Sequence, residues 1–247
     1  MAEKLIVGNW KMNGDAHSNV QLVKSIIQGM KSLNCSVVVC VPSVYLAQVE
    51  VLLRGTNINL GAQDVSSKFG GAFTGEVSAL MLKDFLVRYC IVGHSERRLY
   101  HQESDDDVAQ KVKQALLNGI TPIVCVGETL EQREAGHTEL VVKRQLAAVI
   151  AANGHCISEI VVAYEPVWAI GTGKTAKPDQ AQQVHFLLRN QLKAATDQAD
   201  KIPILYGGSM NVANAALLLS QTDVDGGLVG GASLKPTDFL SIVAAAS

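Results

Sequence analysis

The sequence predicts an α/β protein that folds as a (β/α)8 barrel, with eight parallel strands ringed by helices. Three observations predict this fold. Eight short, β-branched apolar runs alternate with longer amphipathic segments, no linker or low-complexity tract interrupts them, and 247 residues suit one barrel. Regular alternation of strand and helix implies parallel strands joined by right-handed crossovers. We therefore expect a single barrel domain over residues 1–247.

The main alternative is an open, doubly wound sheet of similar length. A dinucleotide-binding sheet of that kind carries the motif G-x-G-x-x-G after its first strand. Here the first apolar run leads into Gly8–Gly14, with the sequence GNWKMNG, which does not match the motif. The barrel is therefore the preferred prediction.

Strands buried on both faces read as continuous apolar runs, and the chain contains eight of them. The expected strands are Leu5–Val7, Ser36–Val41, Ile58–Leu60, Tyr89–Val92, Ile123–Val126, Ile160–Tyr164, Ile204–Tyr206 and Val224–Val229. Helical spacing of apolar residues predicts longer helices between some of them. The expected helices are Asp105–Leu117, Glu139–Ala151 and Pro178–Ala194, with shorter ones at Val212–Leu219 and Ala232–Leu234.

Composition excludes several classes of partner. The 21 basic and 23 acidic residues give a net charge of −2, so the charge balance favours neither nucleic acid nor an anionic membrane. No apolar run approaches the ~20 residues that span a bilayer, and the first residues lack a signal-peptide pattern. Five cysteines without a C-x-x-C pair indicate a reducing, cytoplasmic location. Any anion that the protein binds must be held by locally placed groups.

In a (β/α)8 barrel, the functional site lies at the carboxyl ends of the strands. The polar residues that directly follow the expected strands are Asn9, Lys11, Gln63, Asp64, His94, Glu96, Glu128 and Glu165. Lysine, histidine and glutamate at three strand ends form a set suited to acid–base chemistry. We expect burial to raise the pKa of Glu165 and so make it a usable base. Taken singly, Lys11 could equally be a surface charge, His94 a structural histidine and Glu165 half of an ion pair.

Glycine clusters follow the seventh and eighth expected strands, as Gly207-Gly208-Ser209 and Gly230-Gly231. A backbone can approach a phosphate closely only where no Cβ intrudes, and a helix start offers free N–H groups. These two clusters predict a phosphate site, although paired glycines also make ordinary tight turns.

The segment Pro166–Ala176 is longer than the usual βα loop of about two to six residues, and it carries apolar side chains and glycines. It predicts a lid that closes over the site, with the N–H of Gly171 meeting the phosphate. The alternative is a permanently packed loop.

Six motifs, in order and across essentially the whole chain, carry a resemblance to a known family. They are NWKMN from Asn9, AFTGE from Ala72, GHSERR from Gly93, AYEPVWAIGTG from Ala163, YGGS from Tyr206 and LVGGASL from Leu228. Together they resemble the triosephosphate isomerase family. The resemblance implies interconversion of dihydroxyacetone phosphate and glyceraldehyde 3-phosphate in glycolysis and gluconeogenesis, through an enediolate and without cofactor or metal.

The resemblance also implies a role for each matched residue. Glu165 matches the base that moves a proton between C1 and C2, and His94 matches the neutral group that polarises the carbonyl. Lys11 matches the cation that holds substrate, Asn9 is a neighbouring donor, and Glu96 is a further site residue. The remaining matches are the phosphate contacts Gly171, Ser209, Gly230 and Gly231.

The family resemblance implies a homodimer through the loop Ser66–Ser78. Thr74 is then expected to reach the partner's active site near Lys11 and His94, and Phe73 would be unusual on a monomer's surface. The alternative is a mobile exposed loop.

Three residues depart from the family pattern. Gln102 stands where glycine is common, which implies about 1 kcal/mol of strain if that backbone is left-handed. Gly227 replaces a larger apolar residue, so we expect either a small void or a looser eighth strand, and Met210 stands where valine is common.

Two other functions compete with the isomerase. One is a barrel lyase with a Schiff base on Lys11 or Lys174, but Lys11 lies in a polar stretch that does not desolvate an amine. The other is a phosphate-binding module without catalysis.

Overall fold

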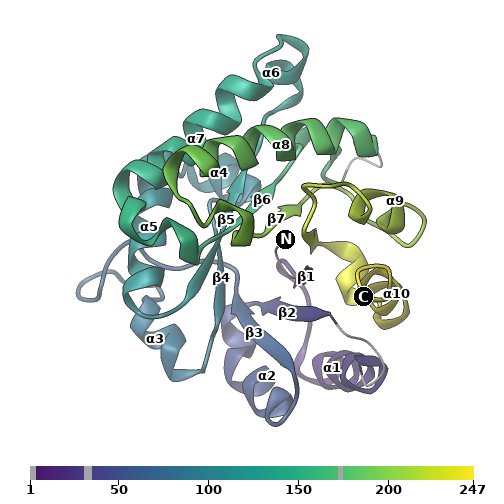
Figure 1. Ribbon diagram of the computed structural model, residues 1–247. Coiled ribbons are helices and arrows are strands. Elements are labelled where there is room, and N and C mark those ends of the chain that lie inside the picture. Colours follow the sequence, from purple (N-terminus) through teal and green to yellow (C-terminus); the bar gives the residue numbers. More distant parts are fainter. Residues whose placement is uncertain (1–3, 31–34, 172–174) are drawn as a thin grey trace.

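The structure, a computed structural model, describes residues 4–30, 35–171 and 175–247. Within them, eight parallel strands pair in chain order and close into a barrel (Figure 1). The strands are β1 (Leu5–Asn9), β2 (Ser36–Val41), β3 (Ile58–Ala62), β4 (Tyr89–Val92), β5 (Thr121–Val126), β6 (Val161–Tyr164), β7 (Ile204–Tyr206) and β8 (Gly226–Val229). The predicted fold class is therefore confirmed.

Helices surround the barrel in the described part of the chain (Figure 1). The α-helices are α1 (Ala16–Met30), α2 (Leu46–Leu53), α3 (Ala79–Asp84), α4 (Ser95–His101), α5 (Asp105–Leu117), α6 (Leu130–Glu134), α7 (Thr138–Asn153), α8 (Pro178–Ala195), α9 (Ala215–Leu219) and α10 (Pro236–Ala244). Short 3-10 helices are η1 (Ser43–Tyr45), η2 (Gly154–Glu159), η3 (Val167–Ala169), η4 (Ala199–Lys201) and η5 (Gly231–Leu234).

One predicted helix is wrong in a way that matters for the site. The apolar segment Val212–Leu219 was expected to be helical throughout, but α9 begins only at Ala215. The side chain of Asn211 accepts the N–H groups of Ala213 and Asn214 at 2.9 and 3.2 Å, which holds the preceding residues in a turn. No helix therefore starts directly after Ser209.

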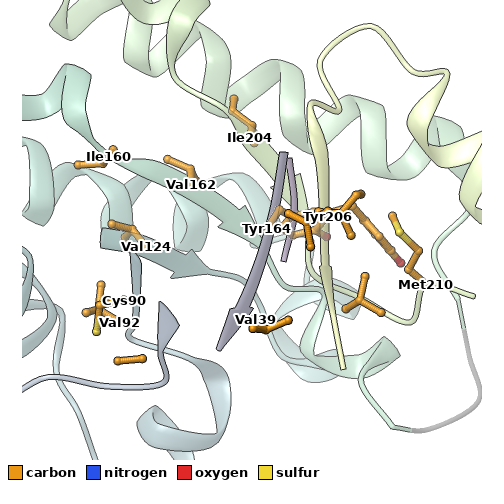
Figure 2. Close-up of a cluster of buried hydrophobic side chains, with 14 of the residues drawn as sticks. Val39, Cys90, Val92, Val124, Ile160, Val162, Tyr164, Ile204, Tyr206 and Met210 are labelled. Carbon is orange, nitrogen blue, oxygen red and sulfur yellow. The ribbon is translucent and has the colours of Figure 1, made fainter. Parts of the chain in front are cut away.

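The buried side chains form two layers because alternate residues of each strand point inward and outward. The inner layer fills the barrel and includes Val7, Cys40, Ile91 and Cys125. The outer layer lies between strands and helices, and Figure 2 shows part of it. Cys40, Cys90, Cys125 and Cys156 are free thiols, and burial raises the pKa of Cys40.

Gln102 ends α4 with φ 56° and ψ 33°, in the left-handed region. This is the backbone that the family glycine would adopt most easily. A side chain costs roughly 1 kcal/mol there because its Cβ crowds the neighbouring carbonyl oxygen. The strain expected at this position is therefore present.

Replacing Gln102 by glycine should raise the free energy of unfolding by roughly 0.5 kcal/mol, since relief of strain exceeds the added freedom of the unfolded chain. The side chain is exposed, so no packing is lost. Urea denaturation measures the change. Gln198→Gly is the matched control, because Gln198 is also exposed but has φ −94°, and it should lose stability. Equal losses in both variants would contradict the prediction.

Candidate active site

The predicted site residues converge at the carboxyl ends of the strands, where two adjoining cavities open. Asn9, Lys11 and His94 line both cavities. One cavity, of about 430 Å³, is also lined by Glu165, Gly171, Ser209, Gly230 and Gly231. The other, of about 550 Å³, is also lined by Gln63, Asp64 and Glu96. The acid–base set and the glycine clusters therefore share one space.

His94 and Glu165 form the centre of this arrangement. The Nε2 atom of His94 lies 2.9 Å from Oε1 of Glu165, and both residues are at least 95% buried, with exposed fractions of 5% and 2%. The backbone N–H of Glu96, at the start of α4, donates to His94 Nδ1 at 3.2 Å. A ring nitrogen that accepts a hydrogen bond carries no proton, so the proton of the neutral ring is on Nε2 and faces the carboxylate.

The charge state of Glu165 differs from the expectation that burial would raise its pKa. Burial alone acts in that direction, but the His94 ring, the N–H of Ser95 and the Lys11 ammonium outweigh it and lower the pKa of Glu165. The Ser95 N–H donates to Oε2 at 2.9 Å. The predicted direction was therefore wrong, because charge and hydrogen bonds within the site exceed desolvation. The outcome is an ionised carboxylate that is free to take a proton.

His94 experiences opposing influences. Burial lowers its pKa, whereas the carboxylate of Glu165 raises it, and the net shift is upward while Glu165 lies against the ring. Protonation at Nδ1 would break the bond from the Glu96 N–H and place a cation at the start of α4, where the helix dipole is unfavourable. These two effects favour the neutral ring once Glu165 leaves its side.

Lys11 is held in place by three groups. Its backbone is left-handed, with φ 52°, and its N–H donates to Oδ1 of Asn9 at 3.0 Å. Gln63 donates from Nε2 to the carbonyl of Lys11 at 2.9 Å. The ammonium lies 2.5 Å from Oε1 of Glu96. This carboxylate partner argues against a Schiff-base role, which needs an amine in apolar surroundings, and Lys174 lies outside the described residues.

The two glycines after β8 lie next to Lys11 and leave open space. A Cβ on Gly230 would lie 3.5 Å from Cε of Lys11, and a Cβ on Gly231 would meet no atom of the described residues within 4 Å. The Ser233 hydroxyl donates to the Gly230 carbonyl at 2.6 Å and fixes the turn into η5. The N–H groups at the start of η5 have no carbonyl in an earlier turn, so they are available to an anion.

Two glycines serve Glu165 in ways that the sequence did not reveal. A Cβ on Gly127 would lie 1.7 Å from the carbonyl oxygen of Glu165. A Cβ on Gly207 would lie 2.9 Å from its Cγ, so Gly207, which was assigned to the phosphate site, also makes room for the base. The only sequence signal for Gly127 is its place between a strand end and Glu128.

Glu128 also follows a strand, but it holds the beginning of the Pro166–Ala176 segment. Its Oε1 accepts hydrogen bonds from the Tyr164 hydroxyl at 3.1 Å and the Trp168 indole at 3.0 Å, and Arg133 lies 3.1 Å away. At the far end of the segment, the Ala176 N–H donates to the Tyr206 hydroxyl at 3.3 Å. Both ends of the segment are therefore anchored, and residues 172–174 lie outside the described part.

Asp64 belongs to a separate cluster of charges. Its carboxylate lies 2.7 Å from the ammonium of Lys111 and 2.9 Å from Nε of Arg97. Glu103 contacts the same two cations at 2.5 Å each. Asp64 is thus committed to ion pairs beside the site, and it is not positioned against His94 or Glu165.

The loop Ser66–Ser78 projects from the barrel between β3 and α3 (Figure 1). Thr74 is exposed within it and lines neither cavity. Phe69 is 68% exposed and Phe73 44%, and Met12, which lines the larger of the two cavities, is 96% exposed. Such large apolar side chains at the surface favour a contact with another molecule.

Among the described residues, no three or more His, Cys, Asp or Glu side chains are grouped so that they could hold a metal ion. Within the same residues, no helix combines the length and the apolar character needed to cross a membrane.

Comparison with known proteins identifies the family of this chain. A family model described as triosephosphate isomerase matches residues 4–246. The triosephosphate isomerase of Albidiferax ferrireducens is 69% identical over 100% of both chains. Those of Paracidovorax citrulli and Delftia acidovorans are each 64% identical, over 99% and 100% of both chains respectively. The chain therefore belongs to the triosephosphate isomerase family.

Proposed function

We propose that this chain interconverts dihydroxyacetone phosphate and glyceraldehyde 3-phosphate, an aldose–ketose isomerisation of glycolysis and gluconeogenesis. The observation that carries the proposal is the buried contact of 2.9 Å between Glu165 and His94 Nε2, in a cavity that Lys11, Gly230 and Gly231 also line. Residues 1–247 act as one catalytic domain.

The acid–base pair supplies both proton transfers. Glu165, as an ionised carboxylate, takes a proton from C1 of the ketose and later returns it to C2. The Nε2–H of His94 donates its proton to the carbonyl oxygen on C2 and stabilises the negative charge that forms on it. Nε2 then takes the hydroxyl proton from the oxygen on C1, so the ring regains its proton while the new carbonyl forms at C1. The substrate oxygen must take the position on Nε2 that Glu165 Oε1 now occupies, so substrate entry separates the pair. Both proton transfers use side chains of the cavity, so this route needs neither cofactor nor metal.

Lys11 and Asn9 bind substrate and offset the charge of the enediolate. Glu96 contributes twice: its carboxylate positions the Lys11 ammonium and its N–H holds the His94 tautomer. The phosphate lies against Ser209, Gly230 and Gly231, with Gly171 contributing from the lid.

Closure of the segment Pro166–Ala176 completes the site. Its anchors at Glu128 and Tyr206 hold the two described ends, from which the segment closes over the substrate. Exclusion of water then strengthens the contacts to the enediolate and limits loss of phosphate from it.

The loop Ser66–Ser78 forms a homodimer contact in this proposal. Thr74 of one protomer approaches Lys11 and His94 of the other, in the cavity of about 550 Å³ that both residues line. The exposed Phe73 supports this contact. The free thiols of Cys40, Cys90, Cys125 and Cys156 support a cytoplasmic location, where reduced cysteines persist.

Glu165→Gln tests the base. The variant keeps the size of the side chain but cannot accept the proton, so we expect kcat to fall by roughly a thousandfold or more while KM changes little. A coupled isomerase assay measures both. Glu131→Gln, the same change at an exposed position of α6, should leave kcat unchanged. Equal turnover in Glu165→Gln and the parent would overturn the mechanism.

Gly231→Val tests the phosphate site. A Cβ at Gly231 enters open space, so the protein should fold normally while inorganic phosphate inhibits it roughly tenfold less well, because the side chain occupies the anion's place. The matched control is Gly154→Val, which also enters open space but lies in η2. Phosphate inhibition that is unchanged in Gly231→Val would count against the site.

Sedimentation of the full chain tests the dimer. We expect a species of twice 26.3 kDa for the parent and a less active monomer for Phe73→Asp, since a charge at that contact would be buried without a partner. Leu117→Asp makes the same kind of change at an exposed apolar residue on α5 and should remain dimeric. A fully active parent of 26.3 kDa would refute the contact.

A further inference from the structure

Two of the residues that depart from the family pattern lie in contact. A Cβ built on Gly227 would lie 2.7 Å from Sδ of Met210 and 2.9 Å from its Cε. Both distances are shorter than an ordinary van der Waals contact of about 3.5–4.0 Å. The expectation of a void at Gly227 is therefore wrong, because the side chain of Met210 fills that space. Met210 is only 5% exposed and belongs to the buried cluster drawn in part in Figure 2.

The contact joins the two halves of the phosphate site. Met210 directly follows Ser209, after β7. Gly227 lies in β8, paired with Tyr206 on one side, and β8 leads within three residues to Gly230. The side chain of Met210 thus reaches from the segment that carries one phosphate contact to the strand that carries the others. Ser209, Met210 and Gly230 all line the same cavity.

In the described part of the chain, the side-chain hydrogen bonds of the Ser209 segment run within the segment itself. The Asn214 amide donates to the Ser209 carbonyl at 3.0 Å, and the Asn211 N–H donates to Asn214 Oδ1 at 2.8 Å. These bonds shape the turn without joining it to β8. The side chain of Met210, by contrast, contacts the strand at Gly227.

We propose that Met210, seated in the space left by Gly227, is a positioning residue that fixes the separation between Ser209 and Gly230–Gly231. The proposal rests on the proposed function in that this cavity takes a phosphate ester. The atoms that a larger residue at 227 would meet, Sδ and Cε, are the flexible end of Met210, but this side chain is 5% exposed and packed within the buried cluster. Its end therefore has little room to turn aside, and the displacement passes to the turn that carries it. Hydrogen bonds to an anion weaken once donor and acceptor separate beyond about 3.2 Å. A shift of less than 1 Å in this turn is therefore enough to weaken the hydrogen bonds to the phosphate.

The pair predicts a specific pattern in a double-mutant cycle. Gly227→Val forces the new side chain against Met210 and should weaken binding of inorganic phosphate roughly tenfold. Its KM should rise in step while kcat stays within about threefold, because neither residue touches the reacting atoms. Met210→Val alone leaves a gap and should weaken the binding of inorganic phosphate about threefold. In the double variant Met210→Val/Gly227→Val, the smaller side chain at 210 makes room for the larger one at 227. This variant should bind phosphate within about twofold of the parent.

Titration calorimetry with inorganic phosphate provides the readout, since it does not depend on turnover. Gly227→Ala is the milder variant if Gly227→Val does not fold, and it should show a smaller loss in the same direction. Val149→Ala, a buried change on α7, should lower the melting temperature without changing phosphate affinity. The variants at residue 227 should instead lose phosphate affinity, and this loss should be larger than any fall in their melting temperatures accounts for.

Three results would overturn the proposal. Parent-like phosphate affinity in both Gly227→Val and Gly227→Ala would do so, as would a double variant that binds as weakly as Gly227→Val. A parent that binds no phosphate would also overturn it. The outcome is separable from the proposed function: a parent without isomerase activity that still shows this coupling supports the pair and refutes the isomerase. A parent that is an active isomerase but lacks this coupling refutes the pair and supports the isomerase.

Discussion

Closure of the barrel between β8 and β1 is the constraint on which the site depends. The pairing places Gly226 opposite Leu5, and a Cβ on Gly226 would lie 1.9 Å from the Leu5 carbonyl oxygen. Only glycine allows the two strands to approach this closely. The same seam brings the residues after β1 beside those after β8, which is why Cε of Lys11 lies next to Gly230. Without this pairing, the cation and the phosphate site would be separate features of an open sheet.

A second requirement is that one carboxylate be buried and yet ionised. Transfer of a charge into a site of low polarity is unfavourable unless hydrogen bonds and opposite charge compensate. Glu165 receives the Ser95 N–H, faces His94 and lies near the Lys11 ammonium, and together these lower its pKa despite full burial. The glycines at 127 and 207 allow its backbone and side chain to reach this position. Packing and electrostatics therefore act on the same residue.

Much of this architecture can be predicted from the sequence, and the exceptions have physical causes. The strands are readable because both of their faces are buried, and α5 has the predicted bounds Asp105–Leu117. The start of α9 was missed because hydrophobicity does not show that the Asn211 side chain competes for backbone N–H groups. Close approaches such as that of Gly127 to Glu165 occur between segments that follow different strands, so no local sequence pattern indicates them. The direction of the Glu165 pKa depended on neighbours that only the fold brings together.

Glu96 serves the site through two different parts of one residue. Its carboxylate contacts the ammonium of Lys11, and its backbone N–H supports the ring of His94. Substitution removes the first contact and leaves the second, because every residue except proline keeps the N–H. Substitution at position 96 therefore acts through the carboxylate, which contacts Lys11 and lies 3.6 Å from His94 Nδ1. The hydrogen bond that holds the His94 ring comes from the peptide backbone. Replacement of the side chain at position 96, in a variant or in the course of evolution, therefore does not remove it.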